Sequence, residues 1–169
     1  MIKSFAATLV IVIPAVIGFG QISILRRRIQ TLTEFITAFE LMRSEICTRL
    51  TPLTELVKIM SREMPVCGFF VALDTAMKDL GHFSFPQIWF NALNAAPGLG
   101  LKDDDIKILG FLGLQLGRYE AGEQEAALSN VIRRLEKNLT GAKGELGVKG
   151  NLYAGLGIAS GLLLAVLLI

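Results

Sequence analysis

The sequence predicts an all-α fold: a compact bundle of about six helices, flanked by an N-terminal and a C-terminal transmembrane helix. Three observations support this fold class. Apolar residues in the middle of the chain recur every three or four positions, which is the period of a helix that packs on one side. No strand-like alternation of useful length occurs. Both ends of the chain, residues 4–25 and 152–169, are apolar and lack charged side chains.

The two apolar ends have the length of membrane-crossing helices. A bilayer core takes roughly 20 apolar residues of helix, with a working range of about 17–25. We therefore divide the chain into an N-terminal transmembrane segment (1–25), a cytoplasmic helical bundle (26–151) and a C-terminal transmembrane segment (152–169).

Charge around the two spans predicts the orientation of the middle domain. Arg26, Arg27 and Arg28 follow the first span, and several basic residues, the last of them Lys149, precede the second. Positive residues beside a span stay in the cytoplasm, so we expect the middle domain there. The alternative is a cleaved signal peptide and an extracytoplasmic domain held by its tail. The first span is longer than a usual signal-peptide core, and no A-x-A-like site follows it.

The composition of the middle domain limits its partners and its compartment. It holds all 15 acidic residues and all basic residues except Lys3, so it is close to neutral. A near-neutral domain without interleaved basic and aromatic residues argues against nucleic-acid binding. The two cysteines, Cys47 and Cys67, are expected to stay reduced in the cytoplasm and to behave as small buried hydrophobic residues.

Prolines and glycines set the expected helix boundaries. The apolar row that starts at Ile29 predicts one helix that continues from the first span to residue 50. Thr51 is expected to cap the next helix, Pro52 to occupy its first position and Pro65 to end it. A further helix is predicted over residues 68–80.

The second half of the middle domain contains three more predicted helices. Ser84 and Gln87 have the spacing of a capping box and open a short helix. The aspartates 103–105 open another, where carboxylates favour the positive helix end; a divalent-metal cluster is the alternative. The last helix runs into the second span.

Glycines recur at every third position just before the second span, and the sequence leaves two interpretations open. They are Gly141, Gly144, Gly147 and Gly150. On a helix they form a stripe of small residues that permits close packing against a neighbour. Equally, each glycine costs a helix about 1 kcal/mol relative to alanine, which favours a soft hinge.

Motifs of enzyme chemistry are missing from the sequence. It contains no G-x-S-x-G, P-loop or G-x-G-x-x-G motif. The single histidine, His82, follows a glycine in an expected turn and has no metal-ligand spacing to the cysteines. We expect no catalytic residue, no cofactor and no metal site, and therefore a protein that is not an enzyme. A membrane-bound enzyme whose site these motifs do not reveal is the alternative.

Several short motifs follow one another in a fixed order along nearly the whole chain. They are Glu45-Ile46 with Thr51-Pro52-Leu53; Trp89 with Leu93; Leu101 with Asp105-Ile106 and Ile108-Leu109; Gly113, Leu116-Gly117, Glu120 and Gln124; and Tyr153, Leu156-Gly157 and Gly161-Leu162. In this order and spacing, the chain resembles the stage III sporulation protein AB family of endospore-forming bacteria.

The resemblance implies a fold, a place and a partner. The fold is a helical domain similar to the cytoplasmic domain of the inner-membrane platform proteins of type II secretion and type IV pilus systems. The place is the membrane around the forespore, facing the mother cell, in the channel complex between the two. The partners are a secretion-type ATPase, stage III sporulation protein AA, the other channel-complex subunits and the lipid bilayer, with no nucleic acid and no small-molecule substrate.

Four polar residues within or beside these motifs are the candidates for contacting the ATPase: Arg43, Glu45, Glu120 and Gln124. A solvated helix position or a local hydrogen bond is the plainer interpretation of each. The family often has glutamate where this chain has Arg43, and aspartate where it has Glu120, so the chemistry of the contact is expected to differ. Leu53, Gly113 and Gly117 are expected to be packing or turn residues.

Overall fold

The computed structural model describes the backbone of residues 2–64, 66–96, 98–116 and 121–168, and the side chains of residues 22–64, 66, 68–96, 98–116 and 122–152. The described part is all-helical, which confirms the predicted helical bundle. Its elements are α1 (Ile2–Ser44), the π-helical turn η1 (Glu45–Arg49), α2 (Leu53–Glu63), the 3₁₀ turn η2 (Val66–Gly68), α3 (Phe69–Ala76), the 3₁₀ turn η3 (Met77–Asp79), α4 (Phe85–Ala95), α5 (Asp103–Gln115) and α6 (Ala121–Leu168).

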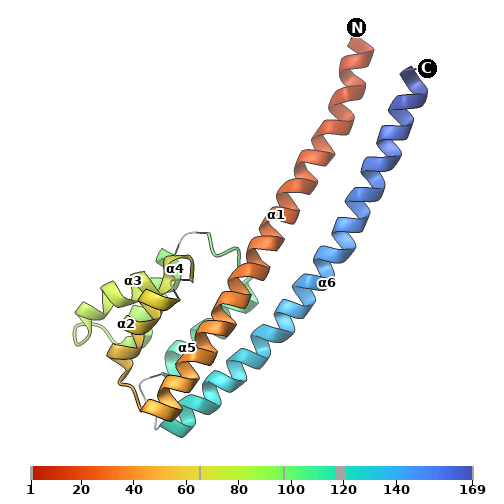
Figure 1. The fold of residues 1–169 in the computed structure, drawn as a ribbon. Coiled ribbons are helices and arrows are strands. Elements are labelled where there is room, and N and C mark those ends of the chain that lie inside the picture. The colour runs from red at the N-terminus through yellow and green to blue at the C-terminus, as the bar shows by residue number, and fades with distance from the viewer. Residues whose placement is uncertain (1, 65, 97, 117–120, 169) are drawn as a thin grey trace.

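Two long helices organise the molecule. α1 and α6 run antiparallel and side by side, so that the two chain ends lie at the same end of the pair (Figure 1). The short helices α2–α5 pack against one side of this pair near its other end. We call that other end, where α1 passes into η1 and α6 begins, the distal end. α1 and α6 are continuous helices across the predicted domain boundaries at residues 25 and 152.

The two predicted spans fall mostly on residues whose side chains lie outside the described set, namely 1–21 and 153–169. Within the part of the chain that is described, no helix is both long enough and apolar enough to cross a membrane.

An aromatic cluster forms the centre of the bundle. Trp89 of α4 is fully buried, and its ring centroid lies 4.9 Å from that of Phe69 and 6.4 Å from that of Phe39. The indole nitrogen donates a hydrogen bond of 3.0 Å to the backbone oxygen of Leu109, so the buried donor is satisfied. Gly113 lies against the indole: a Cβ there would lie 2.3 Å from Trp89 Cδ1. Gly113 is therefore a packing residue, as predicted.

The connection from α1 to α2 differs in detail from the prediction. Pro52 occupies the N-cap position of α2 instead of its first helical position, and Thr51 makes no cap. The Thr51 hydroxyl donates instead to the Glu45 carboxylate, at 3.1 Å. The cause is η1, whose wider π-turn ends with Leu50 in the left-handed conformation (φ 50°).

Other local predictions are confirmed. α2 ends at Glu63, just before Pro65, and α4 begins after Ser84. The backbone N–H of Ser84 donates to Gln87 Oε1 at 2.9 Å, which is one half of the expected capping box. The prediction for Cys47 is wrong, because this residue is exposed. The side chain of Cys67 lies outside the described residues.

The glycine stripe on α6 is not a packing face. A Cβ built at Gly141, Gly144, Gly147 or Gly150 would meet nothing within 4 Å. The stripe therefore lies on the open side of α6, which stays helical through all four positions. Among the side chains that the structure describes, none packs against these four positions.

Candidate partner-binding surface

The distal end brings the last turn of α1, which carries Arg43, close to the first turns of α6, which carry Gln124. Arg43, in the last turn of α1, donates a hydrogen bond of 3.3 Å from Nη1 to Ser129 Oγ of α6. One turn further along, the thiol of Cys47 donates a hydrogen bond to the carboxylate of Glu125. Partial desolvation raises the pKa of the Cys47 thiol, and the bond to Glu125 raises it further. These cross-helix bonds fix the register between η1 and the first turns of α6.

Glu45 is buried and fully engaged in local structure. Its carboxylate accepts hydrogen bonds from Arg49 Nη1 at 2.8 Å and from the Thr51 hydroxyl at 3.1 Å. The Glu45 backbone oxygen accepts the N–H of Leu50, which closes the π-turn. Glu45 therefore shapes the end of α1, and its carboxylate offers little surface to a partner.

The other two predicted residues lie at the start of α6 or before it. Gln124 is half-buried, next to Glu125, and is engaged in an interaction. Glu120 lies outside the described residues, as does Gly117. The structure thus places Arg43, Glu45 and Gln124 around one junction, that of η1 with the first turns of α6.

The most exposed polar groups of this junction were not among the predicted residues. Glu40 and Ser44 lie one turn apart on α1, and Glu123 and Glu125 lie in the first turns of α6; all four are exposed. We call these four residues, with Arg49 and Leu50, the distal surface. Leu50 is 71% exposed, although it is apolar and its backbone is left-handed. The three carboxylates of this set, Glu40, Glu123 and Glu125, outnumber its one cation, Arg49, which is already paired with Glu45. The four-residue spacing from Ser44 could have shown Glu40 as a residue of the same helix face. The first turns of α6, which carry Glu123 and Glu125, are brought to the end of α1 only by the fold.

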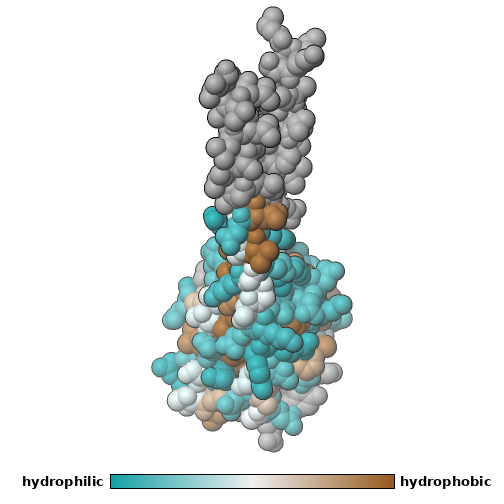
Figure 2. All heavy atoms as spheres, turned by 90° about the vertical axis from the view of Figure 1, so that its right-hand side faces the viewer, coloured by the Kyte–Doolittle hydropathy of each residue, from teal (hydrophilic) through white to brown (hydrophobic). Residues whose placement is uncertain are grey.

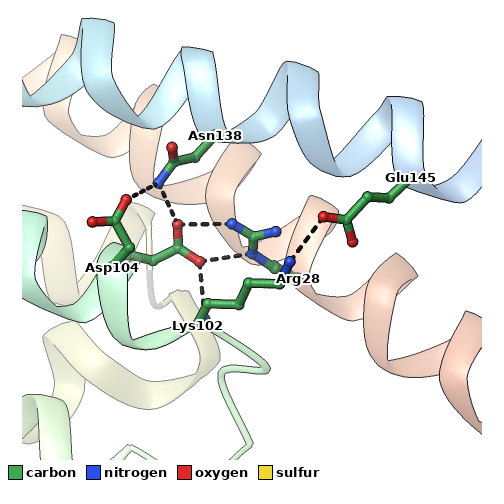
Figure 3. Close-up of polar contacts among 6 residues, drawn as sticks. Arg28, Lys102, Asp104, Asn138 and Glu145 are labelled. Carbon is green, nitrogen blue, oxygen red and sulfur yellow. Dashed lines mark hydrogen bonds and ion pairs between the residues drawn. The ribbon is translucent and has the colours of Figure 1, made fainter.

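A second polar cluster lies toward the chain-end side of the bundle, where it joins α1, α5 and α6 (Figure 3). Arg28 of α1 binds Asp105 of α5 through two hydrogen bonds, Nε to Oδ2 at 2.7 Å and Nη2 to Oδ1 at 3.1 Å. Asn138 of α6 donates to both Asp105 Oδ1, at 2.8 Å, and Asp104 Oδ2, at 3.1 Å. We call Arg28, Asp105 and Asn138 the three-helix clamp.

Burial makes the clamp a strong constraint. The side chains of Arg28 and Asp105 are 7% and 0% exposed. Desolvation alone would raise the pKa of Asp105, but hydrogen bonds from Arg28, from the Lys102 N–H and from Asn138 together hold that pKa below its ordinary value. The bond to Asp105 in turn raises the pKa of Arg28. Both groups stay charged, because each gives the other an opposite charge and hydrogen bonds in place of the water that burial removes.

The clamp also explains what the aspartate triplet does. The backbone N–H of Lys102, the N-cap residue of α5, donates to Asp105 Oδ2 at 2.9 Å. This is the predicted use of a carboxylate at a helix start, and it falls to Asp105. Asp103 and Asp104 are exposed. In the described ranges, no three His, Cys, Asp or Glu side chains are placed to hold a metal ion together.

The basic residues after the first span have different roles. Arg28 is used in the clamp, whereas Arg26 and Arg27 are exposed. The Arg27 guanidinium lies over Gly98 in the loop before α5, where a Cβ would come within 2.7 Å of its Nη2. Gly98 has φ +65°, so both its backbone and its neighbour favour glycine.

Exposed apolar side chains lie beside these arginines. Ile24 of α1 and Val148 and Leu152 of α6 are 56%, 71% and 59% exposed. Figure 2 shows a largely hydrophilic surface over the bundle, with hydrophobic side chains gathered next to the part drawn in grey. The described surface therefore changes from hydrophilic to apolar toward the chain ends.

Comparison with known proteins identifies the family. The family model for stage III sporulation protein AB matches residues 3–169. No curated protein and no solved structure matches the chain. Because the family model covers both long helices and the bundle between them, the chain belongs to the stage III sporulation protein AB family.

Proposed function

We propose that the chain is a non-enzymatic platform subunit that spans the membrane twice and docks a secretion-type ATPase, stage III sporulation protein AA, at its distal surface. The complex is the channel between mother cell and forespore, and the bundle faces the mother-cell cytoplasm. Membership of a stage III sporulation family supports the sporulation setting. The partner and the channel come from the resemblance to platform proteins.

The observation that carries the proposal is the polarity of the molecule along α1 and α6. Both chain ends lie at one end of the helix pair, and the bundle with its distal surface lies at the other. Exposed Ile24 and Leu152 lie nearer the chain ends, and the exposed cations Arg26 and Arg27 come directly after Ile24 on the bundle side, which is the order expected where a span meets the cytoplasm. A partner that approaches from the cytoplasm meets the distal surface first.

Charge supports the distal surface as the docking site. Glu40, Glu123 and Glu125 give this surface an excess of carboxylates, which fits a basic patch on the partner and steers its approach. Arg43 and Glu45 support the surface from beneath by fixing the end of α1 against α6 and closing η1.

Capture of the purified ATPase by the full-length chain in nanodiscs tests the docking. The variant Glu40→Lys/Glu123→Lys reverses two exposed charges of the distal surface, and we expect it to weaken capture at least tenfold. Glu136→Lys, an equally exposed reversal elsewhere on α6, is the matched control and should bind as wild type. If wild-type chain captures no ATPase at micromolar concentration, or if both variants bind equally, docking at this surface is refuted.

Labelling of Cys47 in intact cells tests the orientation. Cys47 is exposed near the distal end, so a membrane-impermeant thiol reagent reports the side on which the bundle lies. With the bundle in the cytoplasm, labelling requires that the cells first be opened. Labelling in intact cells would support the alternative of a cleaved signal peptide and an extracytoplasmic domain. Nucleotide turnover by the purified chain alone would contradict the non-enzymatic role.

A further inference from the structure

The register between α1 and α6 fixes which residues of the two helices lie at the same level. Lys102 bonds Glu145 of α6 at 2.9 Å, beside the Arg28 side chain of α1 (Figure 3). Glu145 is close enough to Arg28 for their charges to interact. Because the helices are antiparallel, residues before Arg28 lie level with residues after Glu145. At the helical rise, Lys149 lies about 6 Å from Glu145 toward the chain ends, level with Ile24.

On the chain-end side of Arg28 and Glu145, the described side chains carry positive charge only. Residues 22–27 and 146–152 contain three basic residues and no carboxylate. Arg26 and Arg27 are exposed, and Lys149 is half-buried. By the register above, the three lie within about one helical turn of one another along the axis of the pair. We call Arg26, Arg27 and Lys149 the basic collar.

The nearest carboxylates lie on the bundle side of the collar and have partners of their own. The bond from Lys102 holds the pKa of Glu145 below its ordinary value, against partial desolvation. The aspartates of α5 lie further away. Asp104 is bonded to Asn138, which is seven residues from Glu145 along α6, or about 10 Å further from the chain ends. The positive charge of the collar therefore remains largely uncompensated within the described structure.

Exposed apolar side chains surround the collar. Ile24, Val148 and Leu152 are all more than half exposed. They lie level with the collar or nearer the chain ends, where the sequence continues into the apolar segments 4–25 and 152–169. A soluble anion gains nothing from such neighbours, whereas a phospholipid combines an anionic phosphate with apolar chains. The arrangement of charge and apolar surface therefore fits a phospholipid better than a free phosphate.

The loop before α5 holds one arginine of the collar in place. As described above, the Arg27 guanidinium lies over Gly98. Gly100 also lies against α1, where a Cβ would be 3.4 Å from the backbone nitrogen of Arg28. The loop therefore packs on α1 directly beside the collar. A guanidinium held in this way has a planar set of donors ready for two oxygens of one phosphate.

We propose that the basic collar binds the phosphate groups of anionic phospholipids, with Ile24 and Leu152 against the adjoining part of their acyl chains. The inference rests on the proposed function, which places the collar at the cytoplasmic face of the bilayer. Each basic residue close to an anionic leaflet strengthens binding by about fivefold. Bound headgroups fix the height at which α1 and α6 leave the bilayer, and with it the position of the bundle above the membrane.

Lipid titration of the full-length chain in uncharged detergent, followed by native mass spectrometry, tests the collar. Wild type should bind phosphatidylglycerol at least tenfold more tightly than phosphatidylcholine. Arg26→Gln/Arg27→Gln/Lys149→Gln, the collar variant, should lose this preference. Arg26→Lys/Arg27→Lys keeps the charge and should retain most of it, which a purely structural role of the two arginines would not predict.

The matched control removes the same charges from another exposed stretch of α6. Arg133→Gln/Arg134→Gln/Lys137→Gln should bind both lipids as wild type does. Equal binding of the two lipids by wild type, or equal losses in the collar and control variants, overturns the proposal. Displacement of phosphatidylglycerol by an equal concentration of glycerol phosphate would assign the site to a free phosphate instead. If the collar variant melts below wild type, Arg26→Gln/Lys149→Gln replaces it and leaves Arg27 on its loop.

Failure of lipid binding and failure of the docking function give different results. The collar and the distal surface lie at opposite ends of the bundle, so the collar variant should capture the ATPase as wild type does. Glu40→Lys/Glu123→Lys should lose the ATPase and keep the preference for phosphatidylglycerol. Resistance to alkaline extraction, measured on every variant in native membranes, shows separately whether the chains are inserted in the membrane.

Discussion

Arg28 and Asp105 are 77 positions apart in the sequence, yet they form a two-bond ion pair inside the bundle. The pair sits where α1 leaves the bundle toward the chain ends, and it holds the start of α5 against α1. Asn138 extends the pair to α6. This one cluster therefore joins α1, α5 and α6.

Breaking the pair from one side should destabilise the protein strongly. Asp105→Asn leaves the Arg28 charge buried without a counter-charge, which typically costs about 3–5 kcal/mol. Arg28→Met/Asp105→Asn removes both charges and should lose clearly less. Thermal unfolding of the full-length chain in detergent, followed by circular dichroism, measures the difference. An Asp105→Asn protein that melts at the wild-type temperature would show that the ion pair does not contribute to stability in this way.

The same pair predicts how stability depends on pH. The folded-state pKa of Asp105 lies below its ordinary value, so its contribution is present above that ordinary value, about 3.9, and is lost as pH falls through the lower folded-state value. The melting temperature of the wild-type chain should therefore fall in this acid range more steeply than that of Arg28→Met/Asp105→Asn. Equal slopes for the two proteins would contradict the assignment.

Two glycines should respond to alanine in opposite directions. At Gly113 the added methyl group overlaps the Trp89 indole, so we expect Gly113→Ala to destabilise the bundle by about 1–3 kcal/mol. At Gly144 the methyl group meets open space on a helix, and Gly144→Ala should stabilise by about 1 kcal/mol. Chemical unfolding of the two variants beside wild type measures both signs. Loss of stability in both would mean that the stripe on α6 has a neighbour after all.

Cys47 should react slowly for an exposed thiol. Its raised pKa lowers the fraction of reactive thiolate at neutral pH, and the bond to Glu125 is one of the causes. In a Cys67→Ser background, Glu125→Gln should increase the rate of alkylation by iodoacetamide and shift its pH profile to lower pH. Glu123→Gln, two positions before Glu125, is the control. If Glu125→Gln leaves the profile unchanged, the cross-helix bond is absent in solution.

The period of the apolar residues and the positions of prolines, glycines and capping residues predicted most of the helices, because these signals are local in the sequence. Ser84 with Gln87 placed the start of α4, and the aspartates placed the start of α5. The π-turn escaped prediction because its bonds join residues only after the chain has bent: Arg49 and the Thr51 hydroxyl both reach the Glu45 carboxylate across the turn. For this reason the sequence predicted Thr51 as the cap of α2, a position that Pro52 occupies in the structure.

The candidate site was predicted less well than the fold. Arg43 and Glu45 were correctly placed at the end of a long helix. The partner of Arg43, Ser129, lies on α6 more than 80 positions away, and the partners of Glu45, Arg49 and Thr51, reach it only through the turn that follows α1. Arg28 was interpreted only as a topological signal, because nothing nearby in sequence reveals Asp105. Contacts between segments far apart in the sequence decide which charged side chains are exposed and which form ion pairs between helices.

The continuity of α1 and α6 has a mechanical consequence. Neither helix is interrupted by a loop between the bundle and the chain ends, so no flexible joint separates the two regions. Because both helices are continuous and are held together by the three-helix clamp, we expect a rotation or displacement of the distal end to move α1 and α6 together. The glycine stretch lowers helix stability on α6 alone, so the two helices should differ in stiffness, and a straight push on the distal end would become a tilt.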